Sequence, residues 1–339
     1  MSTIDSAISQ NGAASYNAKR RTARWDSGEL KKHGAYLLML LPGTVFLFIF
    51  SYLPLPAILM AFKNYKLAIP PKDFWLQNRF FYSLFYKSPW MGLNNFAFIF
   101  SSNDFAIFMR NTLGYNLIFM IIGPIVAVSI AVGINELRQR FAAKAYHTIL
   151  FMPFFLSWII VTYVVYAFIS SNGLFNQVLR SFGADTVNIY SNIKAWPIIF
   201  VIANIWRYAG NNSIIYLATL TGFSQELYEA SMIDGAGKWK QFVYITLPQL
   251  IPTIVLLQIL AVGRILNTDF DMFWNLVNGS GIVHQARLTI DVYVYAAIRG
   301  STNLGLPAAA ALFQSIIGFS LVLLTNAIVR KVDRNMAMF

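Results

Sequence analysis

The chain has 339 residues, of which 57% are hydrophobic and 12% are charged. This composition excludes a soluble globular domain, in which about 25% of residues are charged. The formal net charge is +12 at pH 7, and the chain contains no cysteine, which excludes disulfide and thiol chemistry. The basic residues lie between and beside long apolar runs, so membrane topology explains the positive charge without nucleic acid as a partner.

Six apolar runs are each long enough to cross a membrane as a helix, which takes about 20 residues. Helices are the expected form because a backbone in lipid must satisfy its own hydrogen bonds, and a β-barrel would show short alternating segments instead. The sequence therefore predicts an all-α membrane protein with six transmembrane helices. The runs cover roughly 35–62, 112–134, 147–169, 195–221, 250–276 and 305–329.

Basic residues indicate which ends of these helices face the cytoplasm. If six spans alternate, residues 1–34, the loop after the second span and the C-terminal tail lie on one side, and the positive-inside rule makes that side cytoplasmic. The connection 63–110 is also basic, but it is long enough to weigh little, and we expect it outside. Both termini are therefore predicted to be cytoplasmic. The residues on the inner side are Lys19, Arg20, Arg21, Arg24, Lys31, Lys32, Arg138, Arg140, Lys144, Arg330, Lys331 and Arg334.

A polar loop over 223–250 separates the fourth and fifth runs. Ser224 is a good N-cap for a short helix that we expect to continue to about Asp234. Gly235 suits the left-handed position after a helix end. A second helix, Lys238 to Thr246, should stop before Leu247-Pro248, because a residue preceding proline avoids the helical region. The loop is predicted to form a compact elbow that protrudes from the membrane.

The spacing within this elbow resembles the EAA loop of ABC importer permeases, with Ser231 in place of the second alanine. The resemblance implies that the elbow docks on a separate ATPase subunit. In that reading Glu229 makes a polar contact, Gly235 supplies the turn and the first helix inserts. The coupling residues implied are Glu229, Ala230, Ser231, Asp234, Gly235, Ile245, Leu247 and Pro248.

Two shorter motifs support the resemblance because they precede the elbow in the expected order. Trp90-Met-Gly-Leu-Asn-Asn-Phe96 resembles a motif ahead of the second span in carbohydrate-importer permeases, and Arg110-Asn-Thr-Leu113 resembles the start of that span. From Trp90 onward the chain is most similar to polysaccharide and oligosaccharide permeases of the maltose-permease-like superfamily. This implies a type I ABC importer permease architecture, a permease domain over 35–339 and a place in the bacterial inner membrane.

The resemblance also implies partners and a mechanism. The partners are a second homologous permease, two ATP-binding subunits that hold Mg-ATP, an extracytoplasmic solute-binding protein, membrane lipid and an oligosaccharide. The mechanism is alternating access driven by ATP on the partner chains. This chain is not expected to be an enzyme, because Asp234-Gly-Ala-Gly-Lys238 lacks the first glycine and the hydroxyl of a phosphate-binding loop. No metal site is expected.

Polar residues inside the fourth and fifth runs predict a substrate path, because ionisable groups in spans are costly and usually functional. On helices, Arg207 and Asn211 would share a face, as would Arg264 with Asn267 and Asn267 with Asp271. Trp206, Tyr208, Phe270 and Trp274 are candidate platforms for sugar rings. The predicted path residues are Arg207, Tyr208, Asn211, Arg264, Leu266, Asn267, Asp269, Phe270 and Asp271.

Several alternatives remain open at this point. Arg264 can instead form a structural ion pair with Asp269 or Asp271. The two arginines favour an acidic, uronate-containing oligosaccharide, which is a hypothesis. An ion-driven secondary sugar transporter would need inverted repeats and discontinuous helices, and neither is visible in the sequence. A membrane enzyme would need a catalytic or metal cluster, whereas His33, His147 and His284 are scattered. A non-transport scaffold for a signalling ATPase would not require the polar residues in the spans.

Overall fold

A computed structural model describes residues 34–72, 78–101, 104–137, 139–277, 283–300 and 303–338. The basic tail predicted over 1–34 lies almost wholly outside these residues. Within them the fold is helical, with one isolated antiparallel bridge, Lys63 to Trp90, and no β-strand. The chain forms two compact units, residues 1–56 and 57–339, and each is described by itself.

The first unit holds the beginning of the first predicted span. Helix α3, Gly34–Leu47, continues through Pro42 and gives way to a π-helical turn, Phe48–Tyr52, just before Pro54. The Leu53 N–H donates to the Phe48 carbonyl oxygen, so the wider turn keeps a hydrogen-bond pattern next to the proline. By length and composition, Leu38–Phe62 is able to cross a membrane.

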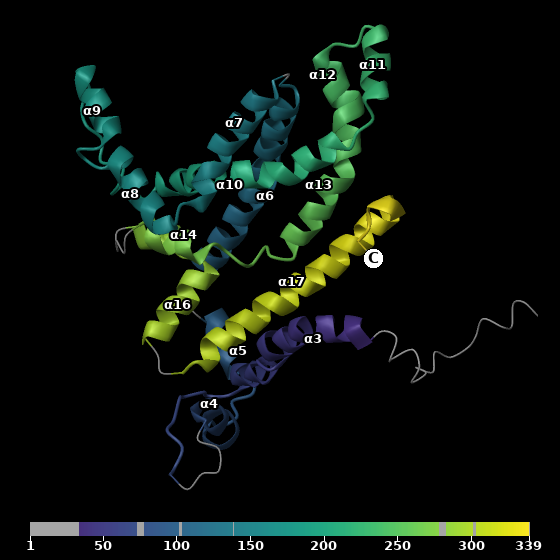
Figure 1. The fold of residues 1–339 in the computed structure, drawn as a ribbon. Coiled ribbons are helices and arrows are strands. Elements are labelled where there is room, and N and C mark those ends of the chain that lie inside the picture. The colour runs from purple at the N-terminus through teal and green to yellow at the C-terminus, as the bar shows by residue number, and fades with distance from the viewer. Residues whose placement is uncertain are drawn as a thin grey trace, which may run out of the picture. The chain divides into compact units, whose positions relative to one another are not determined.

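Two long helices, α6 (Phe105–Asn135) and α10 (Trp196–Thr221), form the most extensive helix pair of the second unit (Figure 1). Aromatic side chains make the centre of the core: the rings of Tyr115, Phe200 and Phe273 lie 4.7–5.7 Å apart. The helices α5 (Asn94–Ser101) and α17 (Gly305–Val332) pack against each other beside this core. The core therefore joins segments that are far apart in the sequence.

The third predicted span, 147–169, is not one continuous helix, which corrects that prediction. Helix α7, Arg140–Phe151, leads through a 3₁₀ turn, Met152–Phe155, into α8, Trp158–Ile169, and α9, Leu174–Ser181, follows. The backbone of α7 lies very close to α10 at Gly210, where an added Cβ would overlap the Leu150 carbonyl group. Glycine at this position therefore sets how closely the two helices approach.

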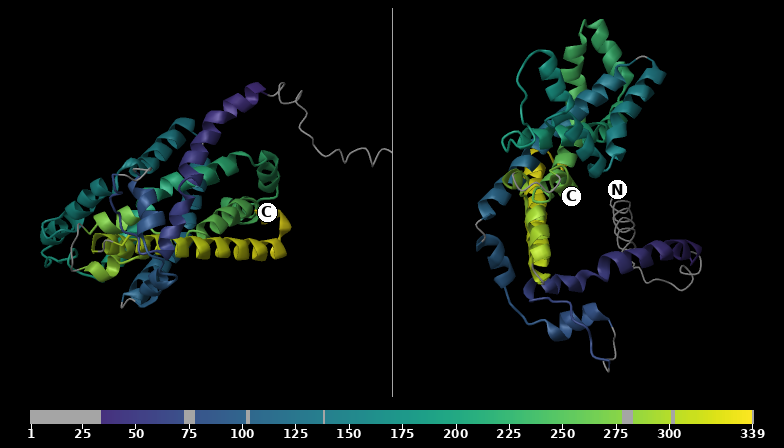
Figure 2. Two further views of the ribbon diagram at one scale, coloured as in Figure 1. Left: turned by 90° about the horizontal axis from the view of Figure 1, so that it is seen from below. Right: turned by 90° about the vertical axis from the view of Figure 1, so that its left-hand side faces the viewer.

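The polar loop and the last third of the chain complete the second unit (Figure 2). Helix α11, Gln225–Ile233, is followed by α12, Lys238–Gln241, a π-helical turn, Phe242–Thr246, and α13, Leu247–Val262. Three shorter helices precede α17 among the described residues: α14 (Phe270–Asn275), α15 (His284–Arg287) and α16 (Ile290–Gly300). The connection after the first span contains α4, Arg79–Tyr82.

Five helical segments of the described residues are long and apolar enough to cross a membrane. The fourth predicted span is also one continuous helix, α10, but it is not among these five, and its middle carries Arg207, Asn211 and Asn212. Six spans therefore remain a prediction. The five segments are Leu38–Phe62, Phe105–Asn135, Trp158–Ser181, Lys238–Val262 and Gly305–Val332.

Candidate functional site

The turn of the elbow has the predicted geometry. Helix α11 ends at Ile233, and Gly235 follows with a φ of +75°, a value that favours glycine. The Ala236 N–H donates to the Ser231 carbonyl oxygen at 2.8 Å and thereby closes the helix end. Ser224 occupies the N-cap position, but its side chain makes no capping hydrogen bond.

Side-chain hydrogen bonds hold the two arms of the elbow together. Gln241, which is 3% exposed, donates from Nε2 to the Ser231 Oγ at 2.9 Å. The Tyr228 hydroxyl lies 3.0 Å from the Thr246 Oγ1. The serine that departs from the Glu-Ala-Ala pattern thus joins the arms, and the elbow is built to move as one body. Sequence reasoning missed Gln241 and Tyr228, because only the fold brings them to Ser231 and Thr246.

The second arm does not stop at Thr246, so the predicted break before Leu247-Pro248 is wrong. The π-helical turn Phe242–Thr246 runs into α13, and the Leu247 N–H donates to the Phe242 carbonyl oxygen. Pro248 therefore lies in the first turn of α13, where a missing N–H costs little. The elbow's second arm is the beginning of a membrane-spanning segment, Lys238–Val262.

The elbow also contacts the end of α6. The Lys238 Nζ lies 2.7 Å from the Glu136 Oε2 in an exposed ion pair. A cavity of about 580 Å³ lies between the ends of α6 and α10 and the elbow, and Glu229 and Met232 are among its lining residues. At the tip, the side chains of Ile233 and Trp239 are 87% and 74% exposed, so an apolar surface is available there for a partner.

The fifth predicted span is discontinuous, which corrects the prediction of one helix over 250–276. Helix α13 ends at Val262, residues 263–269 are not helical, and α14 begins at Phe270. Arg264, Asn267 and Asp271 therefore do not share one helical face. Irregular backbone at membrane depth is tolerated where it is buried in protein or lines a cavity.

Polar side chains from three other helices satisfy this irregular backbone. From α6, the Asn116 Nδ2 donates to the carbonyl oxygens of Ile265 and Asn267 at 2.8 and 3.0 Å. Gln314 on α17 donates to the Leu266 carbonyl oxygen at 2.7 Å. On α16, the Asp291 Oδ2 accepts the Thr268 N–H at 2.6 Å. These contacts stabilise the non-helical conformation of residues 263–269, where a helix would otherwise continue.

Asp269 is the centre of a polar cluster at the end of the irregular segment. Its Oδ2 accepts hydrogen bonds from the Trp158 Nε1 at 2.6 Å and the Tyr208 hydroxyl at 2.7 Å. The Arg207 Nη1 lies 3.8 Å from the same oxygen, and the guanidinium lies 4.5 Å from the centre of the Trp158 ring. A structural ion pair therefore exists, but between Arg207 and Asp269. In the described part of the chain, Arg264 has no ion pair.

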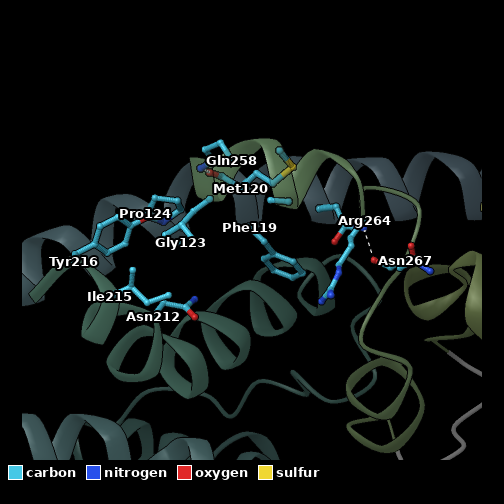
Figure 3. A pocket seen from close by; sticks show the side chains of 13 residues that line it. Phe119, Met120, Gly123, Pro124, Asn212, Ile215, Tyr216, Gln258, Arg264 and Asn267 are labelled. Atoms are coloured by element: carbon cyan, nitrogen blue, oxygen red, sulfur yellow. Dashed lines mark hydrogen bonds between the residues drawn. The ribbon is translucent and has the colours of Figure 1, made fainter. Parts of the chain in front are cut away.

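Arg264 and Asn267 instead line a pocket of about 360 Å³ between α6, α10 and α13 (Figure 3). Asn212 and Gln258 line the same pocket, and Asn212 also lines an adjoining cavity of about 90 Å³ that reaches Tyr208. The structure thus gathers the predicted Arg264, Asn267 and Tyr208 in one region. Sequence reasoning missed Asn212 and Gln258. Asn212 on α10 and Gln258 on α13 are polar residues within apolar runs. This contrast is a signal that the sequence offered.

Other predicted path residues lie elsewhere. Asn211 is not among the lining residues of these two cavities, Leu266 is buried in the core at 4% exposure, and Asp271 is exposed. Phe270 packs on Trp274 and Tyr295, with ring centres 5.8 and 4.7 Å away. These four residues have structural surroundings that differ from those of the pocket.

The predicted aromatic platforms are divided in the same way. Trp206 lines an apolar groove between α8 and α10. The guanidinium groups of Arg287 and Arg299 lie 4.8 and 5.9 Å from the centre of the Trp274 ring. Burial lowers the pKa of Arg287. Of the predicted platforms, only Tyr208 lines one of the polar cavities. The ring of Trp274 instead contacts guanidinium groups of the protein itself.

The two short motifs have structural roles. The Asn95 Nδ2 donates to the carbonyl oxygens of Ala61 and Lys63 at 2.9 Å. The Asn111 Nδ2 donates to the carbonyl oxygens of Gln285 and Leu288, and the Thr112 Oγ1 accepts the Ile290 N–H at 3.0 Å. Asn95 thus holds the chain around the end of the 3₁₀ helix Leu55–Phe62, and Asn111 and Thr112 hold the segment from α15 to the beginning of α16.

Comparison with known proteins identifies the class that this architecture defines. Residues 121–338, more than half of the chain, match the family described as "Binding-protein-dependent transport system inner membrane component". The chain belongs to this family. Protein LplB of Bacillus subtilis (strain 168) is 31% identical over 309 residues, which is 90% of this chain and 91% of that protein.

Two further similarities concern permeases of acidic polysaccharides. The polygalacturonan/rhamnogalacturonan transport system permease protein YteP of Bacillus subtilis (strain 168) is 30% identical over 87% of each chain. A chain in the crystal structure of a bacterial ABC transporter involved in the import of the acidic polysaccharide alginate superposes with a TM-score of 0.77. It is 29% identical, and the match covers 90% of this chain and 98% of that one.

These similarities confirm the resemblance seen in the sequence. The protein is a multi-pass membrane protein with the type I ABC permease fold, and it is the non-catalytic permease subunit of an ABC importer. In such importers ATP is hydrolysed on a separate subunit. Nothing in the comparisons favours an ion-driven transporter.

Proposed function

We propose that this chain forms half of the translocation pathway of an ATP-driven importer for acidic oligosaccharides. One observation carries the proposal: the elbow's second arm is continuous with α13, and α13 ends where the polar pocket begins. A movement of the elbow therefore displaces a wall of the pocket directly. This arrangement supports coupling between a cytoplasmic motor and a path within the membrane.

The complete importer needs subunits that this chain does not supply. We expect a second, homologous permease in a heterodimer, two ATPase subunits that bind Mg-ATP, and an extracytoplasmic solute-binding protein. A solved relative of this chain was crystallised with an alginate pentasaccharide-bound periplasmic protein, which supports the last of these partners. The exposed apolar tip of the elbow, at Ile233 and Trp239, is the surface we assign to the ATPase.

The coupling follows from the joined elements. When ATP draws the two ATPase subunits together, the elbow moves as a body because Ser231 and Gln241 hold its arms. Helix α13 moves with it, and residues 263–269 shift between the side chains that hold them. Access to the pocket then alternates between the two faces of the membrane. ATP hydrolysis resets the cycle.

The charge in the pocket supports an acidic substrate. Asp269 neutralises Arg207 across 3.8 Å, whereas Arg264 lines the pocket without an ion pair in the described part of the chain. A guanidinium binds a carboxylate with paired hydrogen bonds, and Asn212, Asn267 and Gln258 offer amides for sugar hydroxyls. The relatives named for polygalacturonan and alginate handle uronate polymers, which agrees with this charge.

A paired substitution on α11 tests the coupling. Glu229→Ala should lower substrate-stimulated ATP hydrolysis by the reconstituted importer roughly tenfold, since coupling between sites is typically worth about 1–3 kcal/mol. Glu226→Ala, one turn earlier and equally exposed, is the control and should retain stimulation. Equal activity of the two variants would contradict the role of Glu229.

A second test separates charge from sugar identity. Oligogalacturonides should stimulate ATP hydrolysis more strongly than the same oligomers after methyl esterification, which removes only the charge. Arg264→Gln should reduce that preference about tenfold, because a hydrogen bond to a charged group contributes about 1.5–3 kcal/mol. Arg180→Gln, an exposed arginine on α9, is the control. Equal stimulation by both oligomers in the wild type would exclude an acidic substrate.

A further inference from the structure

A second pocket of about 360 Å³ lies apart from the polar cavities, between α8, the loop before α10, and α14. We name it the tyrosine pocket. No charged residue is among its lining side chains, and three of the six are tyrosines. They are Ile159, Thr162, Tyr163, Tyr166, Tyr190 and Asn275.

Two of these tyrosines form a corner. The rings of Tyr166 and Tyr190 lie 5.5 Å apart with planes at 86° to each other. The Tyr190 hydroxyl donates to the Val277 carbonyl oxygen at 2.9 Å, which fixes this ring, and burial raises the pKa of Tyr190. Tyr166 and Tyr163 are 52% and 69% exposed, so their rings are accessible.

Polar groups complete the lining. The Asn275 Nδ2 donates to the Asp271 carbonyl oxygen at 2.9 Å, and this amide has one more N–H and an acceptor oxygen. Flat aromatic faces beside a few amide and hydroxyl groups match a pyranose ring, which presents an apolar face and a rim of hydroxyls. A lipid tail would match only the apolar part of this lining.

The pocket follows α8 from Ile159, near the beginning of this helix, to Tyr166 in its last turn. The Lys238–Glu136 ion pair places the end of α6 beside the elbow, and α7 begins only a few residues later. The chain then runs through α7 and α8 to Ile169, which is therefore at the opposite end. If the elbow is cytoplasmic, the Tyr166 end of the tyrosine pocket lies toward the side from which substrate arrives.

The tyrosine pocket is also connected to the polar cluster. Trp158, at the beginning of α8, donates to Asp269, which caps α14 through the Met272 N–H at 3.3 Å. The two helices that form the pocket are therefore the two that Asp269 joins. A sugar ring bound between α8 and α14 therefore lies next to the residues of the inner path.

We propose that the tyrosine pocket is an outer carbohydrate subsite, in which a sugar ring of the oligosaccharide stacks on Tyr166 and Tyr163 before it enters the inner path. This inference rests on the proposed function. In this inference the outer subsite recognises the ring faces and hydroxyl groups of the sugar, whereas Arg264 recognises its charge. The two sites therefore predict different responses to the same pair of ligands.

The test measures uptake of tetragalacturonate and of its methyl ester by the importer reconstituted in proteoliposomes with its binding protein. Tyr166→Ala and Tyr163→Ala should each raise the KM about threefold to tenfold for both ligands, in line with an aromatic contact. Tyr166→Phe should recover most of the loss. Phe168→Ala is the matched control, because Phe168 is 50% exposed on the same helix but lines the apolar groove beside α10.

Three outcomes overturn the inference. Equal KM values for Tyr166→Ala and Phe168→Ala would show that the pocket does not bind sugar. Loss of the second permease on purification of Tyr163→Ala would make the pocket a subunit interface. A KM increase for tetragalacturonate alone would make it a charge-reading site. If the wild-type importer takes up neither ligand but transports a neutral oligosaccharide, the acidic-substrate proposal fails instead. The KM values of the same variants are then measured with that neutral sugar.

Discussion

At the scale of single residues, Asp269 makes contacts that connect several helices. It accepts hydrogen bonds from Trp158 and Tyr208, pairs with Arg207 and caps α14. Its side chain is 25% exposed and that of Arg207 is 14% exposed, so solvent screens this pair only in part. One carboxylate thus fixes α8, α10 and α14 relative to one another.

Asp269→Ala should destabilise the protein by about 2 kcal/mol, less than the roughly 3–5 kcal/mol for a fully buried pair because Asp269 remains partly exposed. The variant leaves Arg207 without its counter-charge and α14 without its cap. Thermal unfolding of the purified protein in detergent measures the effect as a lower Tm. Asp271→Ala, exposed on the same helix, is the control. A Tm change of the same size in both variants would refute the structural role of Asp269.

At the scale of elements, the continuous segment from α12 through α13 explains how an elbow can act at a distance. The π-helical turn accepts Pro248 without a break, and the segment ends at the pocket. The rigid elbow and the irregular residues 263–269 lie at its two ends. A continuous helical segment between a docking surface and an irregular segment transmits displacement without needing a chain of small side-chain shifts.

Gly235→Ala should weaken the elbow without touching any contact surface. A side chain at a φ of +75° costs about 1–2 kcal/mol, so the turn should open and co-purification of the ATPase should decrease. Gly237→Ala is the control, since Gly237 has a φ of −71° and nothing lies within 4 Å of an added Cβ. Retention of the ATPase by Gly235→Ala at the wild-type level would contradict this expectation.

At the scale of the whole molecule, the match over 90% of the chain to a solved permease establishes the fold, and topology is the next question. If the six predicted spans alternate, the elbow and both termini lie in the cytoplasm and the segment between α9 and α10 lies outside. The helix α10 is the span whose membrane crossing needs a direct test, because its polar residues keep it outside the group of clearly apolar segments.

The absence of cysteine from the chain allows single-cysteine labelling without a modified background. A membrane-impermeant maleimide added to intact cells or spheroplasts should label Ser191→Cys, which lies between α9 and α10. It should label Ser224→Cys, at the start of the elbow, only after permeabilisation. Both serines are exposed, and the substitution changes one atom. Labelling of Ser224→Cys from outside would invert the predicted topology.

The sequence by itself determined the class of the protein. Composition and run length alone required membrane-spanning helices, because so apolar a chain cannot be soluble. The turn of the elbow was recognisable from Gly235, since a turn that needs glycine is a local feature. Local features of this kind depend on residues that are neighbours in the sequence.

Only the tertiary structure decided which polar residues of the fourth and fifth predicted spans contact one another. Residues 263–269 look like helix in the sequence, and they are irregular because Asn116, Gln314 and Asp291 satisfy their backbone from other helices. Arg207 pairs with Asp269, and Arg264 lines the pocket without an ion pair among the described residues, whereas the sequence had left open a pairing of Arg264 with Asp269 or Asp271. These outcomes depend on contacts between residues far apart in the chain, and no local pattern specifies which partner a buried polar group will meet.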